Sequence, residues 1–161
     1  MAYSIQVTGM EELLKKMDKL PEIADKVAAE ALYEGAGVVA DQVSQAVRGI
    51  ATEPFRYAAG GRTRKPSPEE KAIMQGAAKG ISKFRRDGAS INTSVGIQKA
   101  GYAVLDGKTK PIPLIANAIN SGTSFMEKQP FMRKAFSQSK GSAMQAIEEG
   151  LKTRLEEMSE I

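Results

Sequence analysis

A long run of small apolar residues constrains the fold of this chain more than any other feature. Pro21 suits the first turn of a helix, where its missing N–H costs nothing, and Gly49 is a typical stop after a last turn. Between them apolar residues recur every three or four positions, which predicts one helix over about 22–48. Its apolar face consists of Ile23, Val27, Ala31, Leu32, Ala36, Val39, Val43 and Val47.

Two glycines, Gly35 and Gly37, lie inside this predicted helix. Each costs about 1 kcal/mol relative to alanine in a helix. Small residues allow another backbone to approach closely, so tight packing is one explanation and local fraying is the other. The residue pattern alone leaves both open.

A second long helix is predicted from Pro130 toward Met158. Its amphipathic stripe, which must be buried against the domain or a neighbour, consists of Met144, Ile147, Leu151, Leu155 and Met158. Gly141 and a capping box formed by Ser142 and Gln145 predict a kink or restart. We expect the stripe to pack antiparallel on the face of the 22–48 helix.

Period-2 alternation predicts strands at Tyr3–Thr8 and Ile91–Ile97, and a break with glycine predicts that Tyr102–Leu105 pairs with the latter. Capping boxes predict a helix after Thr8, with Met10, Leu13, Leu14 and Met17 on one face, and a helix from Pro68 to about Ile81. A short helix is expected over Leu114–Asn120. The predicted fold class is α+β, one domain over 1–161 with a small antiparallel sheet packed against a long central helix and a long C-terminal helix.

The charge is concentrated in the middle of the chain. Residues 48–110 carry thirteen Lys and Arg against five acidic residues, whereas residues 1–47 carry four Lys against eight acidic residues. Within this block we predict a mobile basic insertion at about 52–67, whose candidate binding residues are Arg56, Arg62, Arg64 and Lys65. A solvated loop explains this charge, and so does a surface that faces nucleic acid or an acidic partner protein.

The composition argues against catalysis. The chain has no His and no Cys, which removes the commonest general acid–base group, the thiolate nucleophile and the usual transition-metal ligands. Glu69 with Glu70, and Glu148 with Glu149, are helix neighbours that point about 100° apart and cannot converge on one atom. We therefore predict no enzyme, no cofactor and no metal site. We also expect no membrane span and no signal peptide.

The segment from Pro111 to Phe136 is the most distinctive motif. A Gly-terminated helix is followed by a loop with a rigid proline and then by the start of a long helix. Because the segment holds apolar side chains and no catalytic groups, it is typical of an assembly surface. The candidate subunit-interface residues are Gly122, Thr123, Phe125, Gln129, Pro130 and Phe131.

These motifs resemble a family of tailed double-stranded DNA bacteriophages, the minor tail-component family, also described as neck, head–tail joining or tail-completion proteins. The resemblance is carried by V-T-G-M-E-E-L at Val7–Leu13, by the long Ala/Val-rich helix, and above all by S-G-T-S-F-M-E-K-Q-P-F-M-R-K-A-F at Ser121–Phe136. The segment 51–88 departs from the family pattern, since it is longer and carries its own predicted helix.

The resemblance implies a small α+β subunit of a homo-oligomeric, hexameric ring in the virion, at the neck or top of the tail. The ring would join a head connector or adaptor protein to the tail tube or tail terminator protein, with passing contact to double-stranded DNA and no contact with a membrane. It would be assembled in the cytoplasm of the bacterial host. The alternative is a basic DNA-binding protein that acts in phage DNA packaging or retention.

Overall fold

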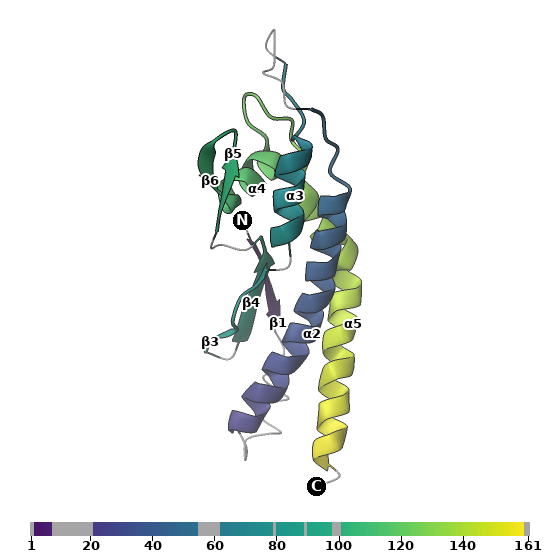
Figure 1. Cartoon of the computed structure of the whole chain (residues 1–161). Coiled ribbons are helices and arrows are strands. Elements are labelled where there is room, and N and C mark those ends of the chain that lie inside the picture. Colours follow the sequence, from purple (N-terminus) through teal and green to yellow (C-terminus); the bar gives the residue numbers. More distant parts are fainter. Residues whose placement is uncertain are drawn as a thin grey trace.

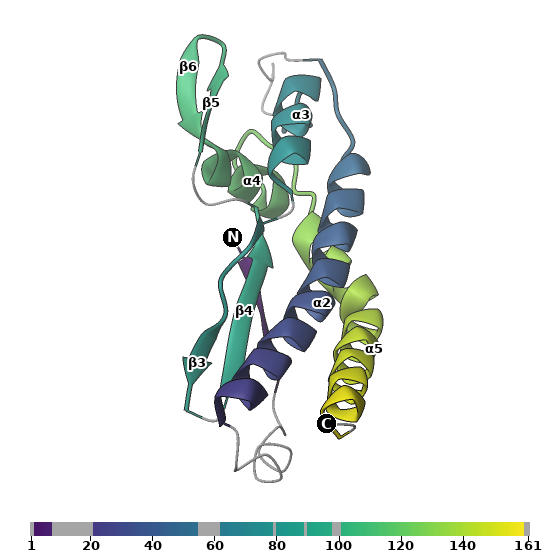
Figure 2. The ribbon, with the colours of Figure 1, turned by 60° about the horizontal axis from the view of Figure 1, so that its bottom comes forward.

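The structure is a computed structural model that describes residues 2–7, 21–54, 62–78, 80–88, 90–97 and 101–159. The helix predicted after Thr8 lies outside the described residues. Two long helices dominate, α2 (Pro21–Arg48) and α5 (Phe131–Ser159), and they run antiparallel along most of the molecule (Figure 1). A small sheet covers the side of α2 that faces away from α5, so α2 is the middle layer of three (Figure 2).

The sheet is antiparallel and is built around β4 (Ser90–Gly96). β1 (Ala2–Val7) pairs along one edge of β4, while β2 (Gly80–Ile81) and β3 (Arg85–Asp87) pair along the other. Ile91, Thr93 and Val95 alternate with less buried neighbours and are buried on the side of α2. This arrangement confirms the predicted α+β class, with a small sheet against long helices.

One predicted strand pairing is wrong. β5 (Tyr102–Leu105) does not pair with β4 but forms a separate two-stranded hairpin with β6 (Lys108–Pro111). The reason is the turn between them, where Asp106 and Gly107 both have positive φ, 49° and 71°. A two-residue Asp-Gly loop with this geometry matches the twist of the strands that it joins.

Two shorter helices support this hairpin. α3 (Pro68–Ala77) begins with the predicted capping box, in which Ser67 and Glu70 exchange hydrogen bonds. It ends at Ala77 and not near Ile81, because Gly80 and Ile81 pair with β4. α4 (Ile112–Ser121) follows β6 directly, so it begins earlier than expected.

The predicted restart of α5 at Gly141 is absent. Gly141 is exposed and lies within a continuous helix of 29 residues, one face of which is held along α2. The buried stripe is also displaced from the predicted one, since Met144 is 48% exposed while Ala143, Ile147 and Gly150 are buried. The predicted antiparallel packing of the two helices is confirmed.

The contact between α2 and α5 explains one of the two glycines. A Cβ atom on Gly35 would lie 2.5 Å from Cγ1 of Ile147 and 3.0 Å from the carbonyl oxygen of Ala143, whereas a Cβ on Gly37 would meet nothing within 4 Å. Gly35 therefore allows close helix approach, and Gly37 has no packing role in the described structure.

These two glycines form a matched pair for mutation. Both Gly35→Ala and Gly37→Ala gain helix propensity of about 1 kcal/mol, but only the Gly35 variant forces Ile147 and the backbone of α5 to move. We expect its free energy of unfolding to be about 1–3 kcal/mol lower than that of the Gly37 variant, as for other overpacked sites. Equal free energies of unfolding of the two variants in chemical denaturation would show that α5 can move away from residue 35 without loss of stability.

Candidate functional site

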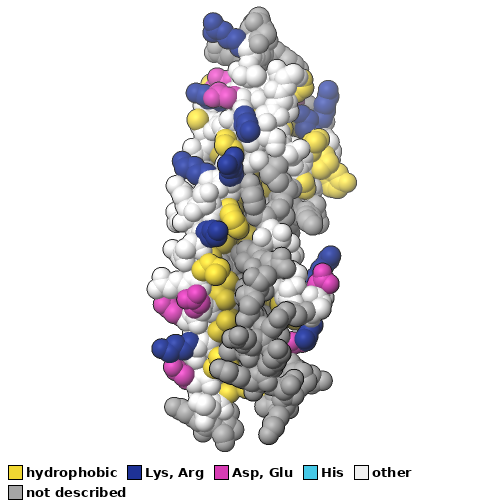
Figure 3. Space-filling model, turned by 180° about the vertical axis from the view of Figure 1, so that it is seen from behind, with side chains coloured by type: hydrophobic (Ala, Val, Ile, Leu, Met, Phe, Trp, Pro, Cys, Tyr) yellow, Lys and Arg dark blue, Asp and Glu magenta, His cyan; other side chains and the backbone are white. Residues whose placement is uncertain are grey.

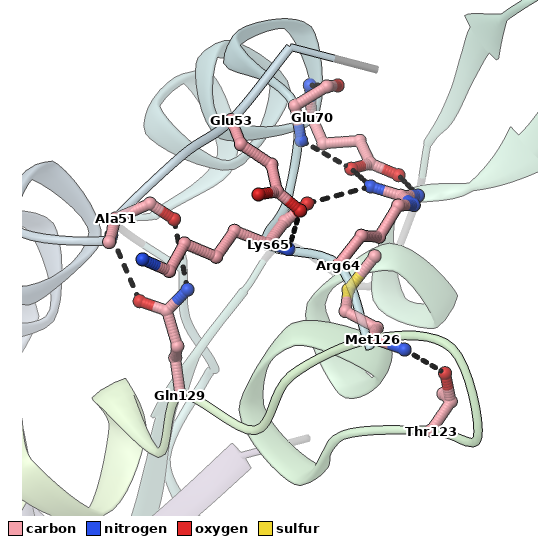
Figure 4. A network of polar contacts seen from close by, with 9 residues as sticks. Ala51, Glu53, Arg64, Lys65, Glu70, Thr123, Met126 and Gln129 are labelled. Carbon is pink, nitrogen blue, oxygen red and sulfur yellow. Dashed lines mark hydrogen bonds and ion pairs between the residues drawn. The ribbon is translucent and has the colours of Figure 1, made fainter. Parts of the chain in front are cut away.

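The distinctive motif lies where α4 ends and α5 begins. Gly122 ends α4 with φ 75°, and its N–H donates to the Ala118 carbonyl at 3.0 Å. The Thr123 hydroxyl oxygen accepts from the N–H groups of Phe125, at 3.3 Å, and Met126, at 3.0 Å. Gly122 and Thr123 thus shape a tight turn within the chain. Figure 4 shows the hydrogen bond from the Met126 N–H to Thr123.

Gln129 connects this turn to the end of α2. Its side-chain amide accepts from the Ala51 N–H at 2.9 Å and donates to the Ala51 carbonyl at 3.0 Å (Figure 4). Its own N–H donates to the Ile119 carbonyl at 2.8 Å. One amide side chain therefore joins residues 78 positions apart in the sequence.

Phe131 does not lie at the surface. It is 4% exposed and belongs to the same core cluster as Met132 and Ala135, so the expectation of an exposed apolar tip at this position is wrong. The sequence predicted an exposed loop, but the first turn of α5 carries Phe131 into the interior. Thr123, Phe125, which is 64% exposed, and Pro130 are the candidate interface residues that lie at the surface.

Part of the basic insertion is held firmly against this motif. The Arg64 N–H donates to the Phe125 carbonyl and the Glu127 N–H donates to the Arg64 carbonyl, both at 2.8 Å. These bonds make a short parallel bridge between Arg64 and Met126. Lys65 donates through its N–H to Oε1 of Glu53 at 2.6 Å.

The Arg64 side chain is paired inside the subunit. Its guanidinium donates from Nη1 and Nη2 to the two carboxylate oxygens of Glu70, both at 2.8 Å, and these side chains are only 15% and 7% exposed (Figure 4). Arg64, predicted as a binding residue of a mobile insertion, is therefore held by Glu70 within the subunit. Glu70 was predicted only as a capping residue, and its second role is a consequence of the fold.

Burial alone would raise the pKa of Glu70. The hydrogen bonds from Arg64 and from the Ser67 N–H, together with the Arg64 charge, outweigh burial and hold this pKa below its ordinary value. In the other direction, the hydrogen bond to Glu70 raises the pKa of Arg64. The pair is ionised at neutral pH and joins the basic segment to the start of α3.

The other predicted basic residues are not brought together with Arg64. Arg62 is exposed, Lys65 is half-buried, and Arg56 lies outside the described residues. Within the described ranges no group of three or more acidic side chains could hold a metal ion, and no helix is long and apolar enough to cross a membrane.

Sequence reasoning missed three of the exposed apolar side chains at this end of the molecule. Tyr102 and Val104 on β5 are 73% and 68% exposed, and Leu114 on α4 is 58% exposed. Figure 3 shows hydrophobic side chains gathered over the hairpin, beside Lys and Arg side chains. The Asp106-Gly107 turn could have revealed this hairpin, because that dipeptide between two short strands is a strong signal.

Comparisons of the chain with protein-family models, with curated proteins and with solved structures found no match. The function is therefore inferred from the surface and the sequence motifs of the chain itself.

Breaking the buried pair should be costly, whereas removing its exposed neighbour should not. Arg64→Gln leaves the Glu70 carboxylate buried without its charged partner, and we expect a loss of about 3 kcal/mol or more in the free energy of unfolding. The control, Arg62→Gln, removes an exposed charge two residues away and should change stability by less than about 0.5 kcal/mol. Similar effects of both variants in urea denaturation would contradict the pairing.

The same pair should make stability depend on pH. Because the pKa of Glu70 is lowered in the folded chain, its contribution is present above its ordinary pKa of 4.5 and is lost as the pH falls through the folded value. The difference in stability between the native chain and Glu70→Gln should be largest near neutral pH and shrink below about pH 4.5. A difference that stays constant in melting curves between pH 7 and pH 3 would argue against a charged pair.

Proposed function

We propose that this chain is a structural subunit of a phage or prophage-derived neck or tail-completion ring, which joins the head connector to the tail. The observation that carries the proposal is the set of large apolar side chains that one end of the molecule leaves exposed: Tyr102, Val104, Leu114 and Phe125. Exposed apolar side chains gathered at one end of a small subunit mark an interaction site.

The motif resemblance supports the same assignment. The Gly-Thr and Gln-Pro-Phe residues lie in one joint that links the ends of α2, α4 and α5 and borders the exposed side chains. In the proposed role this joint holds the interaction surface in a fixed position relative to the helix pair. Phe125 and Pro130 then contact a neighbour, and Gly122, Thr123, Gln129 and Phe131 act through the shape of the joint.

The proposal assigns the chain no reaction, cofactor or metal. Its partners are further copies in a hexameric ring, the head connector or adaptor protein above, and the tail tube or tail terminator protein below. The ring is assembled in the cytoplasm of the bacterial host and becomes part of the virion. Double-stranded DNA makes passing contact with the ring as it leaves the head.

A second candidate function is DNA binding in phage DNA packaging or retention. It is favoured by the excess of positive charge at the hairpin end, where residues 62–71, 101–111 and 122–134 carry nine Lys and Arg against four acidic residues. The pairing of Arg64 with Glu70 weakens this candidate, because that guanidinium is occupied within the subunit.

The proposal is tested by disrupting the gene in the phage or prophage that carries it. We expect DNA-filled heads and separate tails in electron micrographs, and the chain should be detected by mass spectrometry in complete particles from the intact phage. Supplying the intact gene from a plasmid is the control and should restore joined particles.

Joined, infectious particles without this chain would contradict the neck role. The DNA-binding candidate predicts a different result, namely joined particles that lose their DNA. It also predicts that the purified chain binds duplex DNA with an affinity that falls steeply as salt is raised.

A further inference from the structure

The outer face of the β5–β6 hairpin is uncovered. Tyr102 and Val104 lie on this face opposite Pro111 and Thr109, while Leu105, which points to the other face, is buried. The hairpin projects beyond α3 and α4, away from the sheet and the helix pair (Figure 2). A two-stranded hairpin is only marginally stable in water by itself, and this one exposes two large apolar residues.

We infer that this face docks on the opposite end of a second copy of the chain, on the surface formed by the start of α2 and the end of α5. The inference rests on the proposed function, since it names the contact that would link neighbouring subunits of the ring. Three features of the described residues favour a second copy of the chain as the partner. The two ends carry opposite net charge, the far end has an acidic hollow, and another hollow, which is lined by lysines, is a poor receptor.

The two ends carry opposite charge. The hairpin end has nine basic residues against four acidic ones in 62–71, 101–111 and 122–134. The far end has nine acidic residues against five basic ones in 21–34, 85–87 and 148–159. Contact between two hairpin ends would bring like charges together, whereas contact between unlike ends is attractive.

The far end also has a hollow that suits the hairpin. A hollow of about 550 Å³ between α2 and α5 is lined by Glu30, Glu34, Glu149 and Glu157, and its single basic residue is Arg154. Arg154 donates to Glu30 at 2.9 Å and to Glu34 at 2.7 Å, which leaves the lining with a net charge of −3.

An apolar groove lies on the same end of α5. Its volume is about 440 Å³, and Leu151 and Leu155 line it together with two acidic residues, Glu148 and Glu156, and one basic residue, Lys152. Hydrophobic side chains form a stripe along this face of the molecule (Figure 3). Apolar and mainly acidic surfaces are therefore adjacent here. The β5–β6 register places Lys108 and Lys110 opposite Leu105 and Ala103, so the positive charge of this end surrounds the uncharged face of Tyr102 and Val104 and does not lie on it.

Another described hollow is a poor receptor for the hairpin. It has a volume of about 480 Å³ between the end of α2 and the start of α5, and its lining includes Lys128 and Lys134 but no acidic residue. The positive hairpin end would meet like charges there. The charge pattern thus selects the acidic end of α2 and α5.

The contact is heterologous, because each copy contributes the hairpin on one side and the acidic end on the other. Such contacts build a closed ring when the rotation between copies closes, and a filament when it does not. It follows that a subunit with only one intact surface can pair once but cannot continue the assembly.

This property gives a direct test with two one-sided variants of the full chain. The hairpin variant carries Tyr102→Ser and Val104→Ser, and the hollow variant carries Glu149→Lys and Glu157→Lys; all four positions are exposed. We expect the wild type to self-associate in sedimentation and each variant to associate at least about tenfold more weakly. The hairpin variant loses the apolar contact, and the hollow variant places positive charge against the positive hairpin end. An equimolar mixture should form a 1:1 pair that does not grow.

The matched control is Lys140→Glu, which reverses an exposed charge on α5 between the two ends and should leave association unchanged. A wild type that stays monomeric at every accessible concentration, a variant that associates like the wild type, or a mixture that fails to pair would each overturn the inference. The neck role is judged separately, by the presence of the chain in particles and the joining of heads to tails.

Discussion

The packing of α5 against α2 is the contact on which the rest of the structure depends. It requires a residue without a side chain at Gly35, where Ile147 and the backbone at Ala143 come close. Near one end Arg154 bridges Glu30 and Glu34, and near the other Gln129 holds the backbone of Ala51. The 28 residues of α2 span about 42 Å at the rise of an α-helix, so these contacts hold two distant surfaces in a fixed relation.

The Gly-Thr and Gln-Pro-Phe motif makes its contacts mainly within the subunit. Thr123 shapes a turn, Gln129 joins two helix ends, and Phe131 fills the core, while the short parallel bridge at Arg64 ties the basic segment to the same place. The exposed apolar side chains are next to this joint, on β5, α4 and the turn at Phe125. In the proposed role, the motif positions an assembly surface without itself forming most of it.

The two long helices, the capping box at Ser67 and the β4 strand could be predicted because periodicity and capping are local signals. The predicted partner strand of β5 was wrong, because the glycine-containing break before β5 was given more weight than the Asp106-Gly107 turn after it. The restart predicted at Gly141 was also wrong, since tertiary packing along α2 overrides a weak local preference. Neither the Arg64–Glu70 pair nor the burial of Phe131 could be predicted, because both depend on how distant segments meet.

The central claim is that opposite ends of this subunit meet in successive copies, and the absence of cysteine from the chain allows a direct measurement. One chain carries Val104→Cys and another carries Leu151→Cys, and the two are mixed under mild oxidation. The account predicts that the mixed disulfide between the two chains forms much faster than either disulfide between identical chains, as resolved by mass spectrometry. Faster cross-linking of two Val104→Cys chains to each other would contradict it.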